Sequence, residues 1–312
     1  MPNSNFPNGF AHGVTIRGMP LLSAYPGSIY WVDSNNGSDG NPGTFDRPFS
    51  TIDYAVGRCA ASKGDIICVK AGHVETVIAA GGLDLDVAGI CLIGMGSGSL
   101  RPTINFTTAV GADMDVDAAN ITMVNFLFTG GFDALTGPID VNAADFTLLN
   151  CEYRDVTGQA TDVIVADANA DRLLIDGYFH NGAADAGGAS AIALIGMDNP
   201  EIRNFKIIGN FSVAGIDCRT TAVVDLDIHD GYVWNKNAAD VCIKDTITAS
   251  TGKVGPNLNL MLTDNAANIT EAITGATFQY FGGATTKAAS ILVCNLAGEV
   301  ATGINGTEST DA

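Results

Sequence analysis

The sequence predicts an all-β fold, a right-handed parallel β-helix in which the chain winds through a stack of similar coils. Three observations support this fold. Five similar segments recur at intervals of 23 to 28 residues, their apolar runs have the length of strands, and each contains one recurring Asn or Asp.

The five segments occupy the middle of the chain, and another short strand-like piece precedes each of them. They are ITMVNFLF (121–128), FTLLNCEY (146–153), RLLIDGYF (172–179), EIRNFKII (201–208) and VVDLDIHD (223–230). Runs of about 5 to 8 residues rich in Val, Ile, Phe and Thr are typical of strands and lack the periodicity of helical repeats. One such unit cannot close a core, whereas stacked units bury a continuous apolar column. A coil of about 25 residues with three short parallel strands therefore fits one rung of a right-handed β-helix.

The recurring polar residue of each segment predicts a tight turn. Asn and Asp tolerate the left-handed backbone conformation, and stacked amides can bond from one rung to the next. We therefore expect a ladder along one edge of the rod, formed by Asn125, Asn150, Asp176, Asn204 and Asp227. The same turn geometry makes the two Asp residues weak candidates for catalysis.

The segment 29–64 has the content of a cap for the first rung, which would otherwise expose an open core and unpaired backbone. IYWVD (29–33) predicts a strand, a loop rich in Gly and Pro follows, and a short helix has Ser50 as a plausible N-cap. Its apolar face would consist of Ile52, Ala55, Val56 and Cys59. Strands resume in GDIICVKAGHVETV (64–77).

Four regions are thus expected: an N-terminal arm (1–28), the strand, loop and capping helix (29–64), the parallel β-helix (65–262), and a C-terminal extension and tail (263–312). After Lys253 the repeat fades, and we expect an irregular rung at 257–281 and a hairpin at 288–300 with its turn near 296–299. The arm is apolar without its own core, so we expect it either to anchor the protein to a partner or to cover the first rung. The anchoring residues would be Phe6, Phe10, Ile16, Arg17 and Leu21.

Composition excludes several classes of protein. Apolar residues make up 46% of the 312 residues and charged residues 16%, which disfavours disorder. No apolar run approaches the roughly 18 residues of a membrane span, and residues 1–22 lack the pattern of a secretory signal, so we expect synthesis in a cytoplasm. The net charge of −19 repels nucleic acid and anionic membranes, so neither is an expected partner. It also suits a protein displayed in many copies, although any soluble acidic protein would share it.

The seven cysteines form no C-x-x-C pair and no Cys/His cluster, so the sequence predicts no zinc site. Most lie among aliphatic residues at alternating positions, where a free cysteine packs as a small hydrophobe. No cofactor is implied.

Three sets of polar residues are candidates for sites. Alternation with apolar residues favours a solvated strand face over a calcium cluster for Asp113, Asp115, Asp140 and Asp225. His180 and His229, with Tyr232 and Trp234, allow a ligand site, but loop packing is the commoner role of such aromatics. Arg154 and Arg203 could anchor an acidic sugar, whereas pairing with Glu152 and Glu201 is the simpler expectation. No residue is assigned a catalytic or metal-binding role, and a pair of glycosidase carboxylates remains open.

YWVDSNNGSDGNPGTFDRPFSTIDYAV (30–56), followed by GDIICVKAGHVETV, resembles the entry segment of pectate-lyase-like parallel β-helix proteins. The leader NFPNGFAHGVTIRGMPLL (5–22) and the closing GEVATGINGTESTDA are similar to the ends of β-helical virion proteins from tailed bacteriophages. The N-T-D, D-D, G-H-G and R-I-K motifs of polygalacturonase-type hydrolases do not occur.

The resemblance implies a structural protein of a phage virion, made in the host cytoplasm. Our first interpretation is a non-enzymatic capsid decoration or minor capsid protein. Its expected partners are the major capsid protein or another virion protein and further copies of itself, as a homotrimer that buries flat apolar faces. A tailspike depolymerase or a non-catalytic glycan-binding protein is the alternative, so a glycan partner is possible.

Overall fold

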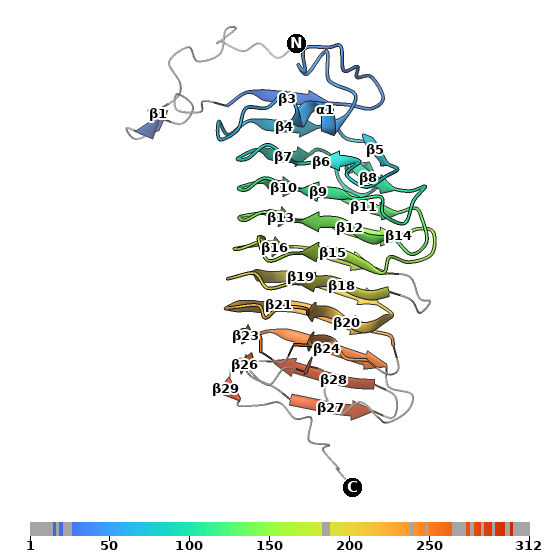
Figure 1. Ribbon diagram of the computed structural model, residues 1–312, viewed down its shortest axis with the longest axis vertical. Helices are drawn as coiled ribbons and strands as arrows, with labels where there is room; N and C mark the ends of the chain where they lie inside the picture. The colour runs from blue at the N-terminus through green and yellow to red at the C-terminus, as the bar shows by residue number, and fades with distance from the viewer. Residues whose placement is uncertain are drawn as a thin grey trace.

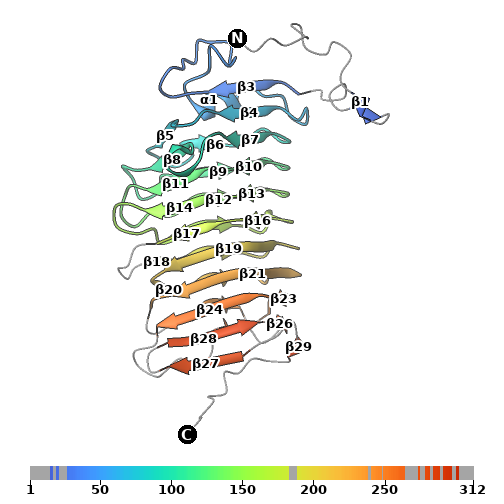
Figure 2. The same ribbon diagram turned by 180° about the vertical axis from the view of Figure 1, so that it is seen from behind.

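The chain forms an elongated rod of stacked coils, seen with its long axis vertical in Figures 1 and 2. The computed structural model describes residues 15–16, 19–20, 27–182, 188–237, 240–247, 249–263, 273–274, 278–281, 284–288, 291–296 and 300–301. The rod is a parallel β-solenoid of about seven turns, which confirms the predicted fold class. Among the described residues, no helix has the length and apolar character needed to cross a membrane.

The rungs form three parallel sheets, which we call A, B and C. The long strands β19 and β21 each run through both sheet A and sheet B. Sheet A contains β3 (Ile29–Val32), β4 (Ile66–Val69), β7 (Cys91–Gly94), β10 (Thr122–Val124), β13 (Thr147–Leu149), β16 (Leu174–Asp176), the first parts of β19 (Glu201–Gly209) and β21 (Leu226–Asn235), β23 (Gly252–Val254) and β26 (Phe278–Phe281). Sheet B contains β5 (Val74–Val77), β8 (Thr103–Phe106), β11 (Leu127–Gly130), β14 (Glu152–Asp155), β17 (Phe179–Asn181), the second parts of β19 and β21, and β24 (Leu258–Thr263). Sheet C contains β6 (Leu83–Asp84), β9 (Met114–Val116), β12 (Thr136–Val141), β15 (Asp162–Ala166), β18 (Gly188–Leu194), β20 (Phe211–Cys218), β22 (Ile243–Asp245) and β25 (Ile273–Thr274).

The core is a set of columns in which equivalent side chains stack along the rod axis. Alternate residues of a strand face inward, and parallel register places like positions above one another. Leu92, Met123 and Leu148 form such a column on sheet A, and all three are buried. On sheet B the rings of Phe106 and Phe128 stack at 6.3 Å. Burial of each such side chain contributes about 1.5–3 kcal/mol.

Cysteines take part in this packing. Cys151, Cys218 and Cys242 are buried in the core, which confirms core packing for these three, whereas Cys68 is buried but faces outward on sheet A. Cys59 and Cys91 are half-buried.

The edge between sheets A and B is a column of tight turns. On six successive rungs, φ between 51° and 72° is adopted by Asn125, Asn150, Gly177, Asn204, Asp230 and Asn257. Asn125 Nδ2 donates to the backbone oxygens of Gly94 and Gly96 at 2.8 and 3.0 Å. Asn257 Nδ2 donates to Asp230 Oδ1 at 2.7 Å, so side chains link neighbouring rungs.

Two members of the ladder expected from the sequence are corrected. Asp176 stands one residue before the turn residue Gly177 and accepts a hydrogen bond from Asn204 Nδ2 at 2.8 Å. Asp227 lies within β21, opposite Glu201, and Asp230 occupies the turn. The segment 223–230 contains three Asp residues, and only the pairing register shows which of them occupies the turn between sheets A and B.

A second column of left-handed residues, absent from the sequence analysis, lies where sheet C leads into sheet A. It comprises Asn120, Asp145, Arg172, Asn199 and Asp225, with φ between 54° and 61°. The Arg172 guanidinium donates to both carboxylate oxygens of Asp145 on the previous rung, at 2.6 and 2.7 Å. Its residue types vary, which hides the repeat in the sequence.

The N-terminal cap is built around α1 (Ile52–Val56), which buries Ile52, Ala55 and Val56 over the first rung. Thr51 is its N-cap, because Thr51 Oγ1 accepts from the Tyr54 amide at 3.3 Å. The expected N-cap, Ser50, instead donates its amide to Asp39 Oδ1 at 2.9 Å. The helix ends at Val56, so Cys59 lies beyond it.

A buried hydrogen-bonded chain supports the start of this helix. The Ile52 amide donates to Glu75 Oε2 at 2.9 Å, and His73 Nε2 donates to the same oxygen at 2.9 Å. His73 Nδ1 in turn accepts from the Ser34 amide at 2.9 Å. Gly43, at φ 75°, allows the ring of Phe49 to pack directly against the loop backbone. The Gly-rich loop thus closes over the rung below it.

Antiparallel strands end the rod. β28 (Ile291–Leu296) pairs antiparallel with β24 and with β27 (Ala284–Ala288), and β29 (Val300–Ala301) pairs antiparallel with β26. β27 and β28 thus form an antiparallel pair, and residues 297–299, where the sequence predicts a turn, lie outside the described part of the chain. Near the other end, β1 (Thr15–Ile16) and β2 (Met19–Pro20) form a short antiparallel pair.

Replacing Asn125 tests the turn ladder. Asn125→Ala strains a left-handed residue and removes two inter-rung hydrogen bonds, so we expect a loss of about 1–3 kcal/mol in the free energy of unfolding. Asn125→Gly keeps the backbone conformation and should lose less. Chemical denaturation measures both, with Asn181→Ala, at an exposed outward position of β17, as the control within about 0.5 kcal/mol of the parent. Equal stability of Asn125→Ala and the parent would contradict the ladder's role.

Candidate functional site

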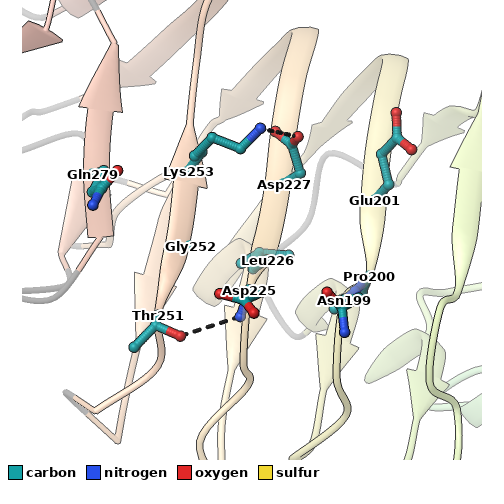
Figure 3. Close-up of a pocket in the computed structure, with 10 residues that line it drawn as sticks. All are labelled: Asn199, Pro200, Glu201, Asp225, Leu226, Asp227, Thr251, Gly252, Lys253 and Gln279. Atoms are coloured by element: carbon teal, nitrogen blue, oxygen red, sulfur yellow. Dashed lines mark hydrogen bonds and ion pairs between the residues drawn. The ribbon is translucent and has the colours of Figure 1, made fainter.

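The outer faces of the three sheets differ in chemistry, because residues in register on successive rungs share one face. Sheet A is apolar on its first strands and ionic from β16 onward, sheet B carries aromatic and basic side chains, and sheet C is acidic on its first strands. The ionic part of sheet A encloses a groove of about 610 Å³, which makes it the candidate site (Figure 3).

The groove is built from one column of outward residues. Glu201 on β19, Asp227 on β21, Lys253 on β23 and Gln279 on β26 lie in register. Lys253 Nζ lies 2.6 Å from Asp227 Oδ2, the upper dashed line in Figure 3. The lining is completed by Asn199, Pro200, Asp225, Leu226, Thr251 and Gly252. A smaller hollow of about 300 Å³ adjoins it and is lined by Asp227, His229, Lys253, Gly255 and Pro256.

The neighbouring column continues the ionic network. Arg203 Nε lies 2.9 Å from Asp176 Oδ2, and Arg203 Nη1 lies 2.6 Å from Glu201 Oε1. His229 stands between two carboxylates, with Nε2 3.2 Å from Glu201 Oε1 and Nδ1 2.6 Å from Asp230 Oδ2. Each cation of this wall therefore lies against at least one carboxylate.

These contacts shift the pKa values of His229 and Asp230. Burial acts to lower the pKa of His229, but hydrogen bonds to Asp230 and Glu201 outweigh it, so the pKa is raised. The hydrogen bond from His229 lowers the pKa of Asp230. Both ring nitrogens face carboxylates, so the imidazolium is the favoured form. Chemically, the wall can donate a proton from His229 to a ligand oxygen and accept hydrogen bonds at Glu201 and Asp227.

Two expected ion pairs are confirmed. Arg203 pairs with Glu201, and Arg154 Nε pairs with Glu152 Oε1. Glu152 also pairs with Arg101, a partner that sequence spacing did not reveal because 51 residues separate the two.

The grouping of the two histidines is wrong. His180 faces inward from β17, is buried, and stacks on Tyr153 with ring centroids 5.3 Å apart. Burial lowers its pKa to about 3. His229 faces outward on sheet A, in register with Asp176 and Arg203, whereas the position of β21 in register with His180 is Val233.

The expectation that Tyr232 and Trp234 pack in a loop is also wrong. Both lie on β21 in the part that belongs to sheet B, at alternate positions that face outward and are half-buried. Their neighbours on adjacent rungs are Lys206 and Asn259 for Tyr232, and Ile208 and Met261 for Trp234.

Of the four acidic residues considered as a calcium cluster, Asp113, Asp115 and Asp140 lie together on sheet C, where Asp84 joins them. Asp84, Asp115 and Asp140 are in register, and Asp113 lies two residues before Asp115. Burial and the surrounding carboxylates raise the pKa of Asp115 to about 6. Asp225 lies apart, in the groove of sheet A. In the described part of the chain, no three His, Cys, Asp or Glu side chains are grouped to hold a metal ion.

The expected anchoring residues lie almost entirely outside the described part. Phe6, Phe10, Arg17 and Leu21 are not among the described residues, and Ile16 is placed only as backbone, in β1. Anchoring by the arm therefore stays a prediction.

Comparison with known proteins agrees with the fold. No family model and no curated protein matches the chain. A solved structure named "Rhamnogalacturonan lyase" is similar with a TM-score of 0.50 and 13% sequence identity, over 90% of this chain and 86% of that one. At this identity the similarity shows a common right-handed, pectate-lyase-like β-helix fold.

Removing His229 should destabilise the protein in a pH-dependent way. A raised folded-state pKa contributes stability that is fully present below the unfolded pKa of about 6.5 and is lost as pH rises through the folded pKa. The Tm difference between His229→Gln and the parent should thus be largest near about pH 6 and shrink toward about pH 9. Asn257→Gly removes another Asp230 partner without a titrating group, so its effect should not vary with pH over this range. A pH-independent His229 effect would contradict the assignment.

Asp115→Asn should stabilise the protein at neutral pH. With its folded pKa raised to about 6, Asp115 favours folding only in its protonated form, so this contribution is lost as pH rises from about 4 through 6. Thermal unfolding should show a higher Tm for the variant at about pH 7.5 and a vanishing gain near about pH 4.

Asp145 provides the control of opposite sign. The hydrogen bond from Arg172 lowers its pKa, so Asp145→Asn should destabilise at neutral pH and lose that effect as pH falls through the folded pKa. The same sign for both variants at neutral pH would contradict the electrostatic argument.

Proposed function

We propose that this chain is a non-enzymatic structural protein of a phage virion, most specifically a capsid decoration or minor capsid protein. In this role it is a rigid rod whose N-terminal arm attaches it to the major capsid protein or another virion protein. Further copies of the chain pack beside it as a homotrimer.

The observation that carries the proposal is an apolar strip on the outer face of sheet A. Its members face away from the core in two columns over the first six rungs: Ile29, Trp31, Ile66, Cys68, Cys91, Ile93, Thr122, Val124, Thr147, Leu149 and Leu174. A contiguous outward apolar surface is typical of protein contacts. Ile29, which is 54% exposed, begins the strip directly after the arm.

Three further features support this role. The turn ladders and the cap make a stiff body whose length is set by the number of rungs. The resemblance of residues 5–22 and of the closing segment 298–312 to β-helical virion proteins of tailed bacteriophages supports the virion as its location. A net charge of −19 favours solubility at high copy number.

A depolymerase is the second candidate, and the groove on sheet A favours it. Glu201 and Asp227 line the groove, and His229, whose pKa is raised, lines the adjoining hollow; carboxylates and histidine are residue types used in acid–base cleavage of sugars. The solved structure with a similar fold is named as a lyase. Turnover of host polysaccharide by the purified chain, measured as reducing ends or unsaturated uronates, would overturn the non-enzymatic proposal.

Separate variants test the two contacts of the structural role. Deletion of residues 2–24 should leave a folded rod that no longer copurifies with particles. Val124→Lys places a charge in the apolar strip and should convert trimers to monomers in light scattering, because an unpaired buried charge opposes association. Val165→Lys is the matched control: Val165 is an outward, half-buried valine on sheet C, and its substitution should leave trimers intact.

Copy number decides the location. Quantitative mass spectrometry of particles should find very many copies for a capsid decoration and only a few for a tail or vertex fibre. Absence of the chain from particles would overturn the virion role. Misfolding after the arm deletion would show that the arm caps the rod rather than anchors it.

A further inference from the structure

The outer face of sheet B carries aromatic and basic side chains in two adjacent columns. Phe179 on β17, Lys206 on β19 and Tyr232 on β21 are in register. Beside them Ile208, Trp234 and Met261 form the second column. These six residues with Lys236 are called the aromatic strip, and their strands stack on successive rungs in Figure 2.

The lysines of the strip lie against its rings. Lys206 Nζ is 5.4 Å from the ring centroid of Phe179 and 5.8 Å from that of Tyr232, so it bridges two aromatic residues two rungs apart. Lys236 Nζ lies 5.3 Å from the Trp234 ring. The Tyr232 hydroxyl donates to Met261 Sδ at 3.5 Å. Ring and cation positions are thereby set before any ligand arrives.

The outer face of sheet B has few acidic residues, although the chain as a whole is acidic. The protein has 34 acidic and 15 basic residues, yet the outward positions from β5 to β24 include one carboxylate, Glu152. Arg101 and Arg154 both pair with it. Within the described residues, no carboxylate lies in ion-pair range of Lys206 or Lys236. Sheet B is therefore a cationic face on an acidic protein.

We propose that the aromatic strip binds an acidic polysaccharide laid along the rod axis. Sugar rings would stack on Phe179, Tyr232 and Trp234, while acidic groups would meet the two lysines and, toward the N-terminus, Arg154. The apolar faces of sugar rings suit aromatic surfaces, and the cations select anionic over neutral chains.

Spacing fits an extended chain better than a compact ligand. Rungs repeat every ~4.8 Å along the axis, close to the length of one sugar residue, so successive sugars meet successive rungs. Sheet C, with Asp84, Asp115 and Asp140 on its outer face, would repel the same ligand. The charge pattern thus directs an anionic chain to one face.

Binding is measured by calorimetry on the purified full chain. The probes are alginate hexasaccharide, neutral maltohexaose and poly-L-glutamate, an anion without sugar rings. We expect alginate to bind at least about tenfold more tightly than either other probe, because only alginate has both sugar rings to stack on the aromatic residues and carboxylates to meet the lysines. Raised salt should weaken the interaction.

Substitutions locate the site. Trp234→Ala, Tyr232→Ala and Lys206→Gln should each weaken alginate binding by about tenfold while circular dichroism stays unchanged. Lys244→Gln, an outward lysine on sheet C, and Tyr54→Ala, an exposed aromatic on the cap, should bind as the parent does.

Four results would overturn the proposal: no binding at millimolar hexasaccharide, equal binding of maltohexaose, equal binding of poly-L-glutamate, or parental affinity in the three strip variants. Strip variants that lose self-association or particle attachment but keep saccharide binding would assign the strip to a protein partner instead. The inference does not rest on the virion role. A chain absent from particles that still binds alginate would end the proposed function and leave this site standing.

Discussion

The structure depends on parallel register between coils, and two columns of left-handed turns hold that register. A strand paired one residue out of step would turn its core face to solvent. At Asn125, Asn204 and Asn257, one side chain satisfies backbone or side-chain acceptors of a neighbouring rung while its own backbone makes the turn. The Arg172–Asp145 pair acts similarly at the second edge. The residues that make the left-handed turns therefore also align neighbouring rungs.

Register has a functional result, because it turns scattered residues into continuous surfaces. Each of Glu201, Asp227 and Lys253 lies 26 residues after the one before it in the sequence, and the three are adjacent on sheet A. Phe179, Lys206 and Tyr232 become one aromatic strip in the same way. The rod thus carries an apolar and ionic face, a cationic face and an acidic face on one scaffold, each able to change without the others.

The repeat and the fold were predictable because Asn at a left-handed turn is a strong signal and strand-length apolar runs exclude helical solenoids. Asp227 was misplaced because three acids at close spacing fit the same pattern, and only hydrogen-bonded pairing separates turn from strand. The groove and the aromatic strip depend on register across rungs, and a shift of one residue exchanges inside and outside. His180 and His229 illustrate this: similar in sequence context, one is buried beside Tyr153 and the other lies between Glu201 and Asp230.

The capped first rung and the antiparallel closing strands confine irregular structure to the two ends. Between them, each coil meets its neighbours through the same pairing, so a whole coil can be gained or lost without disturbing either terminus. Evolution or design can therefore alter the reach of this molecule in increments of ~4.8 Å while both terminal structures stay the same.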